Sequence, residues 1–190
     1  FLFVGISNVR EYLPFFLLCL LPAGPAFAAV LFSMNRVLHG IETSAWKDYR
    51  TGYVQDLQKK LALAAIQSVL IWVFWTNVEF FSLQIPFFPL TVLFFLLFLG
   101  TVLMTPNLYL LAARYQMGVK DYLKGAMLLT ISKPALTFGN IIAAVFILML
   151  LEIRAGTVIL FMASIYGFLI VFMNRKVLGI LDRQAEGVEK

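Results

Sequence analysis

The sequence predicts an all-α fold, a polytopic transmembrane helical bundle, from its composition, its long apolar runs and the placement of its basic residues. Of its 190 residues, 62% are hydrophobic and 13% are charged, whereas soluble domains average about 45–50% and about 25%. A chain this short cannot hide such an excess of apolar surface inside a water-soluble core. We therefore expect a single transmembrane helical domain over 1–190 whose main partner is the lipid bilayer.

Five apolar runs have the length of a membrane span. A helix needs roughly 20 apolar residues to cross the hydrocarbon core, and strands are disfavoured because the alternation of a barrel strand is absent. The expected spans cover about 12–37, 61–80, 87–108, 125–151 and 157–173.

The first run is interrupted near its middle by Pro22, Gly24 and Pro25. In a continuous helix each proline leaves the carbonyl four residues earlier without its hydrogen bond. A helix that starts at Pro25 avoids this loss, because the first turn needs no N–H there. A kink gives five spans, whereas a turn makes the run a hairpin and gives six. Broken helices also form substrate sites in transporters, so these three residues are a candidate functional break.

An amphipathic helix is predicted over about 44–58, between the first two spans. Its aromatic and apolar residues recur every three or four positions and so share one helical face. They are Trp46, Tyr49, Tyr53 and Leu57. Such a helix lies at the membrane interface with its aromatic rings at headgroup depth. It is either an ordinary connection between spans or a docking face for a cytoplasmic partner.

Polar residues within the third and fourth spans are candidate intramembrane sites. Asn107 and Arg114 are seven residues apart and share a face if their helix continues. Lys133 lies about two turns inside the fourth span, where it either snorkels to the headgroups or faces a polar interior. Asn140 lies on roughly the same face of a continuous helix as Lys133. Hydrogen bonding between helices is the simpler role for Asn107.

The basic residues predict the orientation of the spans. Of the 15 Lys and Arg residues, all but Arg10 and Arg154 lie in the segments 36–60, 111–133 and 175–190. Cytoplasmic loops carry such an excess, so the 36–60 loop, the 109–124 loop and the C-terminus are expected in the cytoplasm. The net charge of +5 is thus a topology signal, and we expect no nucleic-acid partner.

Motifs for chemistry are absent from the sequence. The single Cys19 and single His39 provide neither a disulfide nor a zinc cluster, and no pair of intramembrane carboxylates is placed for acid–base catalysis. We therefore expect no enzyme, no catalytic residues, no cofactor and no metal.

Several blocks of the chain together resemble the YesL family of small bacterial integral membrane proteins, which is defined by a domain of unknown function. They are GPAFAAVLFSMNRVLHG, WKDYRTGYVQDLQKKLALAAIQ, NLYLLAARYQMGVKDYLKGAMLLTISKPALT and NRKVLGIL. The family pattern joins a G-P-[AS]-x-A-A entry, an aromatic W-x-x-[FY] helix and an L-x-A-R-[FY] loop. The resemblance covers most of the chain.

The resemblance implies a biological context and no catalytic residues. Family members are typically encoded beside carbohydrate ABC importers, so it implies an accessory component of oligosaccharide uptake in the bacterial cytoplasmic membrane. Its partners would be the permease or nucleotide-binding subunits of a sugar ABC importer. Two alternatives stay open: a small independent transporter or channel, and a membrane scaffold or regulator linked to sugar sensing.

Overall fold

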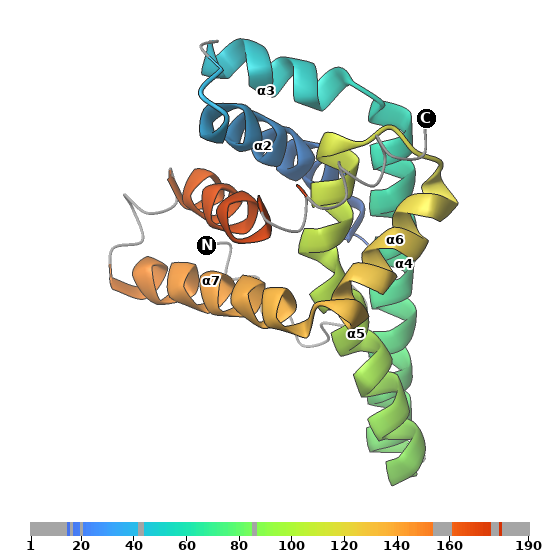
Figure 1. Ribbon diagram of the computed structural model, residues 1–190. Helices are drawn as coiled ribbons and strands as arrows, with labels where there is room; N and C mark the ends of the chain where they lie inside the picture. The colour runs from blue at the N-terminus through green and yellow to red at the C-terminus, as the bar shows by residue number, and fades with distance from the viewer. Residues whose placement is uncertain are drawn as a thin grey trace.

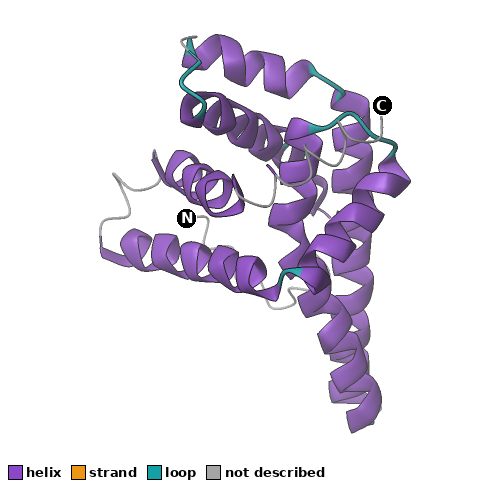
Figure 2. Cartoon of the chain, viewed as in Figure 1, coloured by secondary structure: helices purple, strands orange, loops and turns teal. Residues whose placement is uncertain are grey.

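The computed structural model describes residues 15, 17–19, 21–41, 44–84, 87–153, 161–175 and 179. Over these residues the secondary structure is helical, with short connections (Figure 2). The helices are α2 (Ala23–Leu38), α3 (Ala45–Val54), α4 (Leu57–Glu79), the π-helical turn η1 (Phe80–Gln84), α5 (Phe88–Arg114), α6 (Val119–Ser132), α7 (Pro134–Ile153) and an unlabelled helix over Phe161–Arg175. Their all-helical character confirms the all-α part of the predicted fold class.

The longest unit is the hairpin of α4 and α5, which extends well past the other helices (Figure 1). Aromatic pairs hold its two arms together. The rings of Trp75 on α4 and Phe98 on α5 lie 5.4 Å apart, and Phe81 in η1, which continues α4, stacks on Phe94 of α5 with centroids 5.6 Å apart. None of the most apolar stretch of α5 is buried inside the molecule. The hairpin therefore presents the apolar surface that a lipid-facing span requires.

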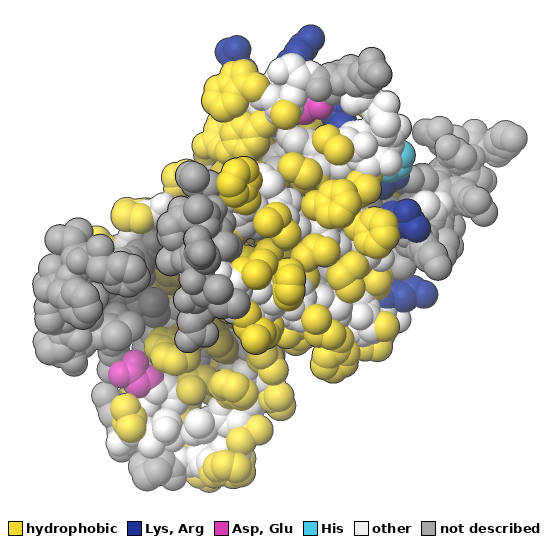
Figure 3. All heavy atoms as spheres, turned by 90° about the vertical axis from the view of Figure 1, so that its left-hand side faces the viewer, with side chains coloured by type: hydrophobic (Ala, Val, Ile, Leu, Met, Phe, Trp, Pro, Cys, Tyr) yellow, Lys and Arg dark blue, Asp and Glu magenta, His cyan; other side chains and the backbone are white. Residues whose placement is uncertain are grey.

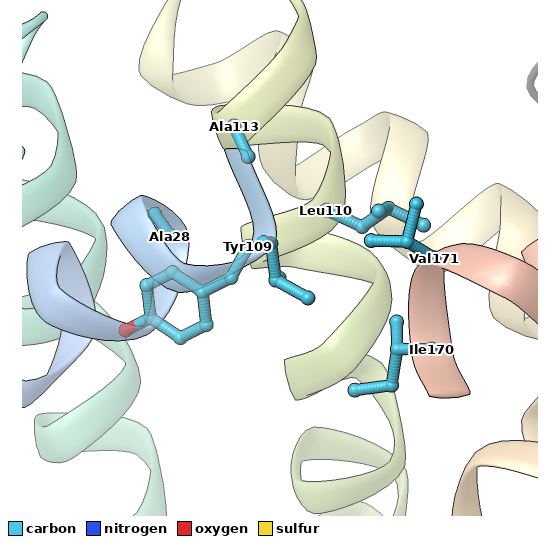
Figure 4. Close-up of a cluster of buried hydrophobic side chains, with 7 residues drawn as sticks. Ala28, Tyr109, Leu110, Ala113, Ile170 and Val171 are labelled. Carbon is cyan, nitrogen blue, oxygen red and sulfur yellow. The ribbon is translucent and has the colours of Figure 1, made fainter. Parts of the chain in front are cut away.

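Two buried clusters join this hairpin to the other helices. The first packs α2, α5 and the 161–175 helix together (Figure 4); its residues are Ala28, Leu31, Tyr109, Leu110, Ala113, Ile170 and Val171. The second joins α4, α5 and α6 through Leu63, Leu108, Leu111, Ala112, Tyr122 and Ala126. Both clusters use the C-terminal half of α5, which is therefore the centre of the fold.

The break in the first apolar run is a short interruption of the helix at Leu21 and Pro22, after which α2 begins at Ala23. The segment Leu17–Leu38, which contains this interruption, counts as one candidate span. The carbonyl of Pro22 accepts the N–H of Ala26 at 3.2 Å. Pro25 falls in the first turn of α2, where its missing N–H costs nothing. The helix thus begins two residues before Pro25. The alternative hairpin, with six spans, depends on residues before Phe15, which lie outside the described residues.

Within the described residues, three helical segments are long and apolar enough to cross a membrane: Leu17–Leu38, Leu57–Leu83 and Phe88–Arg114. A fourth is possible only if α6 and α7, which are bent by 94° relative to each other, count as one span. The five expected spans are therefore not confirmed. The last expected span, 157–173, corresponds to a shorter apolar helix, Phe161–Arg175, and residues 154–160 lie outside the described part of the chain.

The expected continuous span over 125–151 is wrong, because the helix breaks at Lys133. Lys133 has φ −125° and ψ 64°, which is not helical. The next residue is Pro134, and a proline disfavours helical geometry at the residue before it. The bend between α6 and α7 is therefore encoded by the Lys133–Pro134 pair.

Hydrophobic side chains cover much of the described surface in Figure 3, and Lys and Arg side chains lie from the top of that view, the end at which α3 packs, down to about mid-height. We call this end, which carries α3 and the connection between α5 and α6, the basic end of the bundle.

Candidate functional site

Helix α3 packs along α2 at the basic end (Figure 1). The two helices approach closely at Gly52, where a Cβ atom would lie 2.9 Å from the Cβ of Phe32. Beside this point Asp48 is buried, with 5% exposure, and its Oδ1 lies 3.2 Å from Nε of Arg36 on α2. The pair is an electrostatic contact, because the Arg36 Nε–H is not aligned for a hydrogen bond. The close packing at Gly52 and the attraction between Arg36 and Asp48 together hold α3 on α2.

A second contact ties α3 to α4. Nζ of Lys60 donates a hydrogen bond to the carbonyl of Gly52 at 2.6 Å, and Lys60 is only 3% exposed. Between the two helices the chain turns at Asp56, which has a left-handed backbone (φ 52°). A buried ammonium requires such a partner. Helix α3 is therefore held by contacts to both α2 and α4.

One side of α3 carries a row of stacked aromatic rings, which we call the aromatic row: the exposed Trp46 and the half-buried Tyr49 and Tyr53. The ring centroids of Trp46 and Tyr49 are 6.2 Å apart, and those of Tyr49 and Tyr53 are 6.3 Å apart. Trp46 is 74% exposed. Because α3 ends at Val54, Leu57 belongs to α4 and does not extend this row, unlike in the expected helix over 44–58.

The opposite flank of α3 is basic. Lys47 and Arg50 border a shallow cleft of about 510 Å³ that also includes Thr51, Val54 and Gln55. Among the described residues neither cation has an ion-pair partner. The exposed surface of α3 therefore combines flat aromatic rings with uncompensated positive charge.

A chain of buried asparagines lies deeper in the bundle. Nδ2 of Asn140 on α7 lies 3.3 Å from Oδ1 of Asn107 on α5 and donates to it. Asn174 on the 161–175 helix donates in turn to Oδ1 of Asn140 at 3.3 Å. Each residue is at most 3% exposed. We call these three residues the asparagine chain; it joins three helices through amide groups in an otherwise apolar core.

Two threonines connect the asparagine chain to the α6–α7 bend. Asn107 donates to Oγ1 of Thr130 on α6 at 3.0 Å. The hydroxyl of Thr137 on α7 donates to the carbonyl of Thr130 at 3.2 Å. Carbonyl groups near a proline-containing break lose their helical partners. The threonine hydroxyl of α7 replaces one of those partners and thereby holds the bend.

The structure separates the predicted polar residues into different environments. Asn107 and Asn140 meet, whereas Lys133 is exposed at the bend and shares no face with Asn140. Arg114 points elsewhere, with Nη1 3.3 Å from Oδ1 of Asn35 on α2. Asn174 was missed, because it follows the expected last span by one residue and precedes Arg175. The sequence feature that could have identified Asn174 is its spacing of four residues from Ile170 in the last apolar run. In the structure Ile170 is buried, and Asn174 donates a hydrogen bond to its carbonyl.

Comparison of the chain with protein-family models, with curated proteins and with solved structures finds no match. The resemblance to the YesL family stays a prediction from the quoted sequence blocks. The fold and the site by themselves define a class: a helical protein whose described part has three or four apolar segments long enough to cross a membrane, and an amphipathic helix fixed at its basic end.

Proposed function

We propose that the protein is an integral membrane subunit that binds a partner protein through α3 and thereby assists carbohydrate uptake. The observation that carries this proposal is the aromatic row of Trp46, Tyr49 and Tyr53, stacked on a helix that is clamped in place. Trp, Tyr and Arg are the residues that most often dominate binding energy at protein interfaces. A surface that is already ordered loses little entropy when a partner binds.

The partner class follows from orientation and from the sequence resemblance. The excess of Lys and Arg at the basic end favours a cytoplasmic position for α3. Nucleotide-binding subunits and the cytoplasmic loops of permeases of ABC importers are accessible there. The resemblance to the YesL family favours an importer of oligosaccharides. The protein would then reside in a bacterial cytoplasmic membrane with its C-terminus inside, and its partner would supply ATP hydrolysis.

An independent transporter or channel is the weaker alternative. The Lys133/Asn140 face on which that alternative relied is divided by the bend, and the asparagine chain is occupied by its own hydrogen bonds. A polar pathway would need groups that are free to bind a solute. A scaffold or regulator for a sugar sensor would use the same aromatic row as our leading proposal, so the two differ only in the partner.

A site-specific photocrosslinker tests the proposal directly. We would place p-benzoylphenylalanine at Trp46, irradiate cells grown on oligosaccharides, and identify the crosslinked protein by mass spectrometry. Position Trp75 is the matched control, because it is also an exposed aromatic residue but lies toward the far end of α4. We expect importer permease or nucleotide-binding subunits crosslinked from position 46 and none from position 75.

A functional measurement completes the test. Trp46→Ala should reduce oligosaccharide uptake while Trp75→Ala leaves it unchanged, with both variants present at normal levels in the membrane. Crosslinks to a sensor kinase would shift the proposal to the regulator. If position 46 crosslinks only to lipid or to nothing, and uptake is unaffected by Trp46→Ala, the proposed partner-binding role is wrong.

A further inference from the structure

Two adjoining cavities lie beside the turn at Pro22, away from α3. One, of about 290 Å³, lies between α2, α4 and α5, and its lining includes Gly24, Gln67, Thr105 and Tyr109. The other, of about 260 Å³, lies between Leu18 and Leu21 on one side and Trp72 on α4 on the other. Leu17 and Ser68 line both cavities. We call the first the inner cavity and the second the outer cavity.

The inner cavity is lined by a hydroxyl group that has no hydrogen-bond partner among the described residues, that of Tyr109. Tyr109 is 5% exposed, and within the described part of the chain its hydroxyl makes no hydrogen bond. In Figure 4 this hydroxyl points away from Ile170 and Val171, toward α2 and α4. A Cβ atom at Gly24 would lie 2.7 Å from it, so only glycine leaves room for it there. The hydroxyl of Tyr109 is therefore available to donate a hydrogen bond to a ligand in the inner cavity.

The inner cavity also contains a hydrogen-bond acceptor, the side-chain amide oxygen of Gln67. Nε2 of Gln67 donates to Oγ1 of Thr105, whose own hydroxyl donates to the carbonyl of Thr101 at 3.2 Å. The amide of Gln67 is thereby fixed, and no described residue donates to its Oε1. Gln67 is only 7% exposed. The inner cavity thus offers a phenol donor and an amide acceptor in apolar surroundings.

The lining also indicates the charge of a ligand. None of the residues that line either cavity is ionisable except Tyr109. A phosphate or carboxylate would therefore enter without a counter-charge, which is costly in an apolar site. The inner cavity is also far larger than the roughly 30 Å³ that one water occupies in the liquid. An uncharged ligand with both an apolar body and a hydrogen-bonding headgroup fits these observations.

We infer that the two cavities bind a neutral glycerolipid with a free hydroxyl, such as diacylglycerol, from the surrounding membrane. Its headgroup lies in the inner cavity, where the ester carbonyl accepts from Tyr109 and the hydroxyl donates to Gln67. An acyl chain follows the outer cavity to the surface, where Val69 and Trp72 are 55% and 41% exposed. Tyr109 lies five residues before the end of α5 at Arg114, about 8 Å along the helix axis. This depth suits a glycerol backbone.

Quenching of Trp72 by brominated lipids tests the inference. We would keep Trp72 as the single tryptophan, with Trp46→Phe and Trp75→Phe, and reconstitute the full chain in phosphatidylcholine vesicles. Dibromo-diacylglycerol should quench Trp72 saturably at a mole fraction at which dibromo-phosphatidylcholine has little effect. Tyr109→Phe removes only the hydroxyl and should weaken this binding about 2–10-fold, the worth of one hydrogen bond.

Two further variants keep the test decisive. A chain with Trp75 as the single tryptophan reports lipid outside the cavities, because Trp75 packs against Phe98 and lines neither cavity. Quenching of Trp75 should depend only on the total concentration of brominated lipid in the bilayer, whichever of the two lipids carries the bromine. Ser68→Leu fills volume shared by the cavities and should abolish saturable quenching of Trp72. Equal quenching of Trp72 by both lipids would overturn the inference. If quenching of Trp72 is saturable but is unchanged by both Tyr109→Phe and Ser68→Leu, the assigned site is wrong.

Discussion

Asn140 and Asn107 are joined by a buried hydrogen bond of 3.3 Å between residues 33 positions apart. The bond connects α7 to α5 across the 94° bend that separates α7 from α6. Hydrogen-bonded asparagines are an effective way to fix one arrangement of apolar helices, since dispersion contacts alone allow many. The asparagine chain therefore specifies where α7 and the 161–175 helix pack.

Asn140→Ala should destabilise the fold by about 0.5–2 kcal/mol, because it leaves Oδ1 of Asn107 without a donor and Asn174 without its acceptor on α7. Denaturant unfolding in mild detergent would measure the change. Asn77→Ala is the matched control: among the described residues Asn77 bonds only the carbonyl of Val73 on its own helix, at 2.8 Å, and its loss should cost less than about 0.5 kcal/mol. Equal effects of the two substitutions would show that the asparagine chain does not hold the helices together.

The sequence could identify two members of the asparagine chain but not their contact. Asn107 and Asn140 were candidates because an amide within an apolar run needs a partner. The face assigned to Lys133 and Asn140 assumed one continuous helix, and the break at Lys133 removes that face. Pro134 indicated a local loss of hydrogen bonding, whereas the size of the bend depends on Thr130, Thr137 and the packing of α7. Those contacts join residues of different helices, so no short stretch of the sequence predicts them.

Gly24→Ala should destabilise the protein by about 1–3 kcal/mol, the usual cost of an extra methyl group in a tight contact. The new Cβ would lie 2.7 Å from the Tyr109 hydroxyl and 2.8 Å from the Cβ of Ala64. Gly100→Ala is the control, because no atom lies within 4 Å of its Cβ position; alanine there should be neutral or stabilising by up to about 1 kcal/mol. Thermal unfolding of the two variants compares them.

A double variant separates the two contacts at Gly24. Tyr109→Phe removes the hydroxyl and should restore part of the stability lost in Gly24→Ala, with the contact to Ala64 left in place. Strictly additive effects of Gly24→Ala and Tyr109→Phe would contradict this, because residues in contact are expected to couple.

The break at Pro22–Pro25 shows what local sequence reasoning can achieve. The position of the prolines at a helix start follows from their missing N–H groups, and the structure places the start of α2 two residues before Pro25. The reason for Gly24 was not predictable. It lies in the distance from α2 to Tyr109 and Ala64, which depends on how three helices pack.

Lys60→Met should loosen α3 while the rest of the bundle stays folded. The substitution removes the donor to the Gly52 carbonyl but keeps a long apolar side chain. A hydrogen bond from a charged group contributes about 1.5–3 kcal/mol, so amide hydrogen exchange over 45–54 should accelerate roughly tenfold or more. Lys59→Met is the control: its ammonium pairs with Asp56 at 3.0 Å and its side chain is 41% exposed. Unchanged exchange in Lys60→Met would mean that packing on α2 alone holds α3.

Lys133→Cys should react with a water-soluble maleimide from the same side of the membrane as Lys47→Cys. Lys133 is exposed at the α6–α7 bend, and an ammonium is stable only where headgroups or water reach it. With Cys19→Ala as background, labelling of sealed inverted vesicles and of intact spheroplasts would locate both positions. Phe138→Cys is the control, because Phe138 is 65% exposed on apolar α7 and should stay unlabelled within lipid. Labelling of Lys133→Cys and Lys47→Cys from opposite sides would contradict the predicted orientation of the basic end, and no labelling of Lys133→Cys would place the bend in the hydrocarbon.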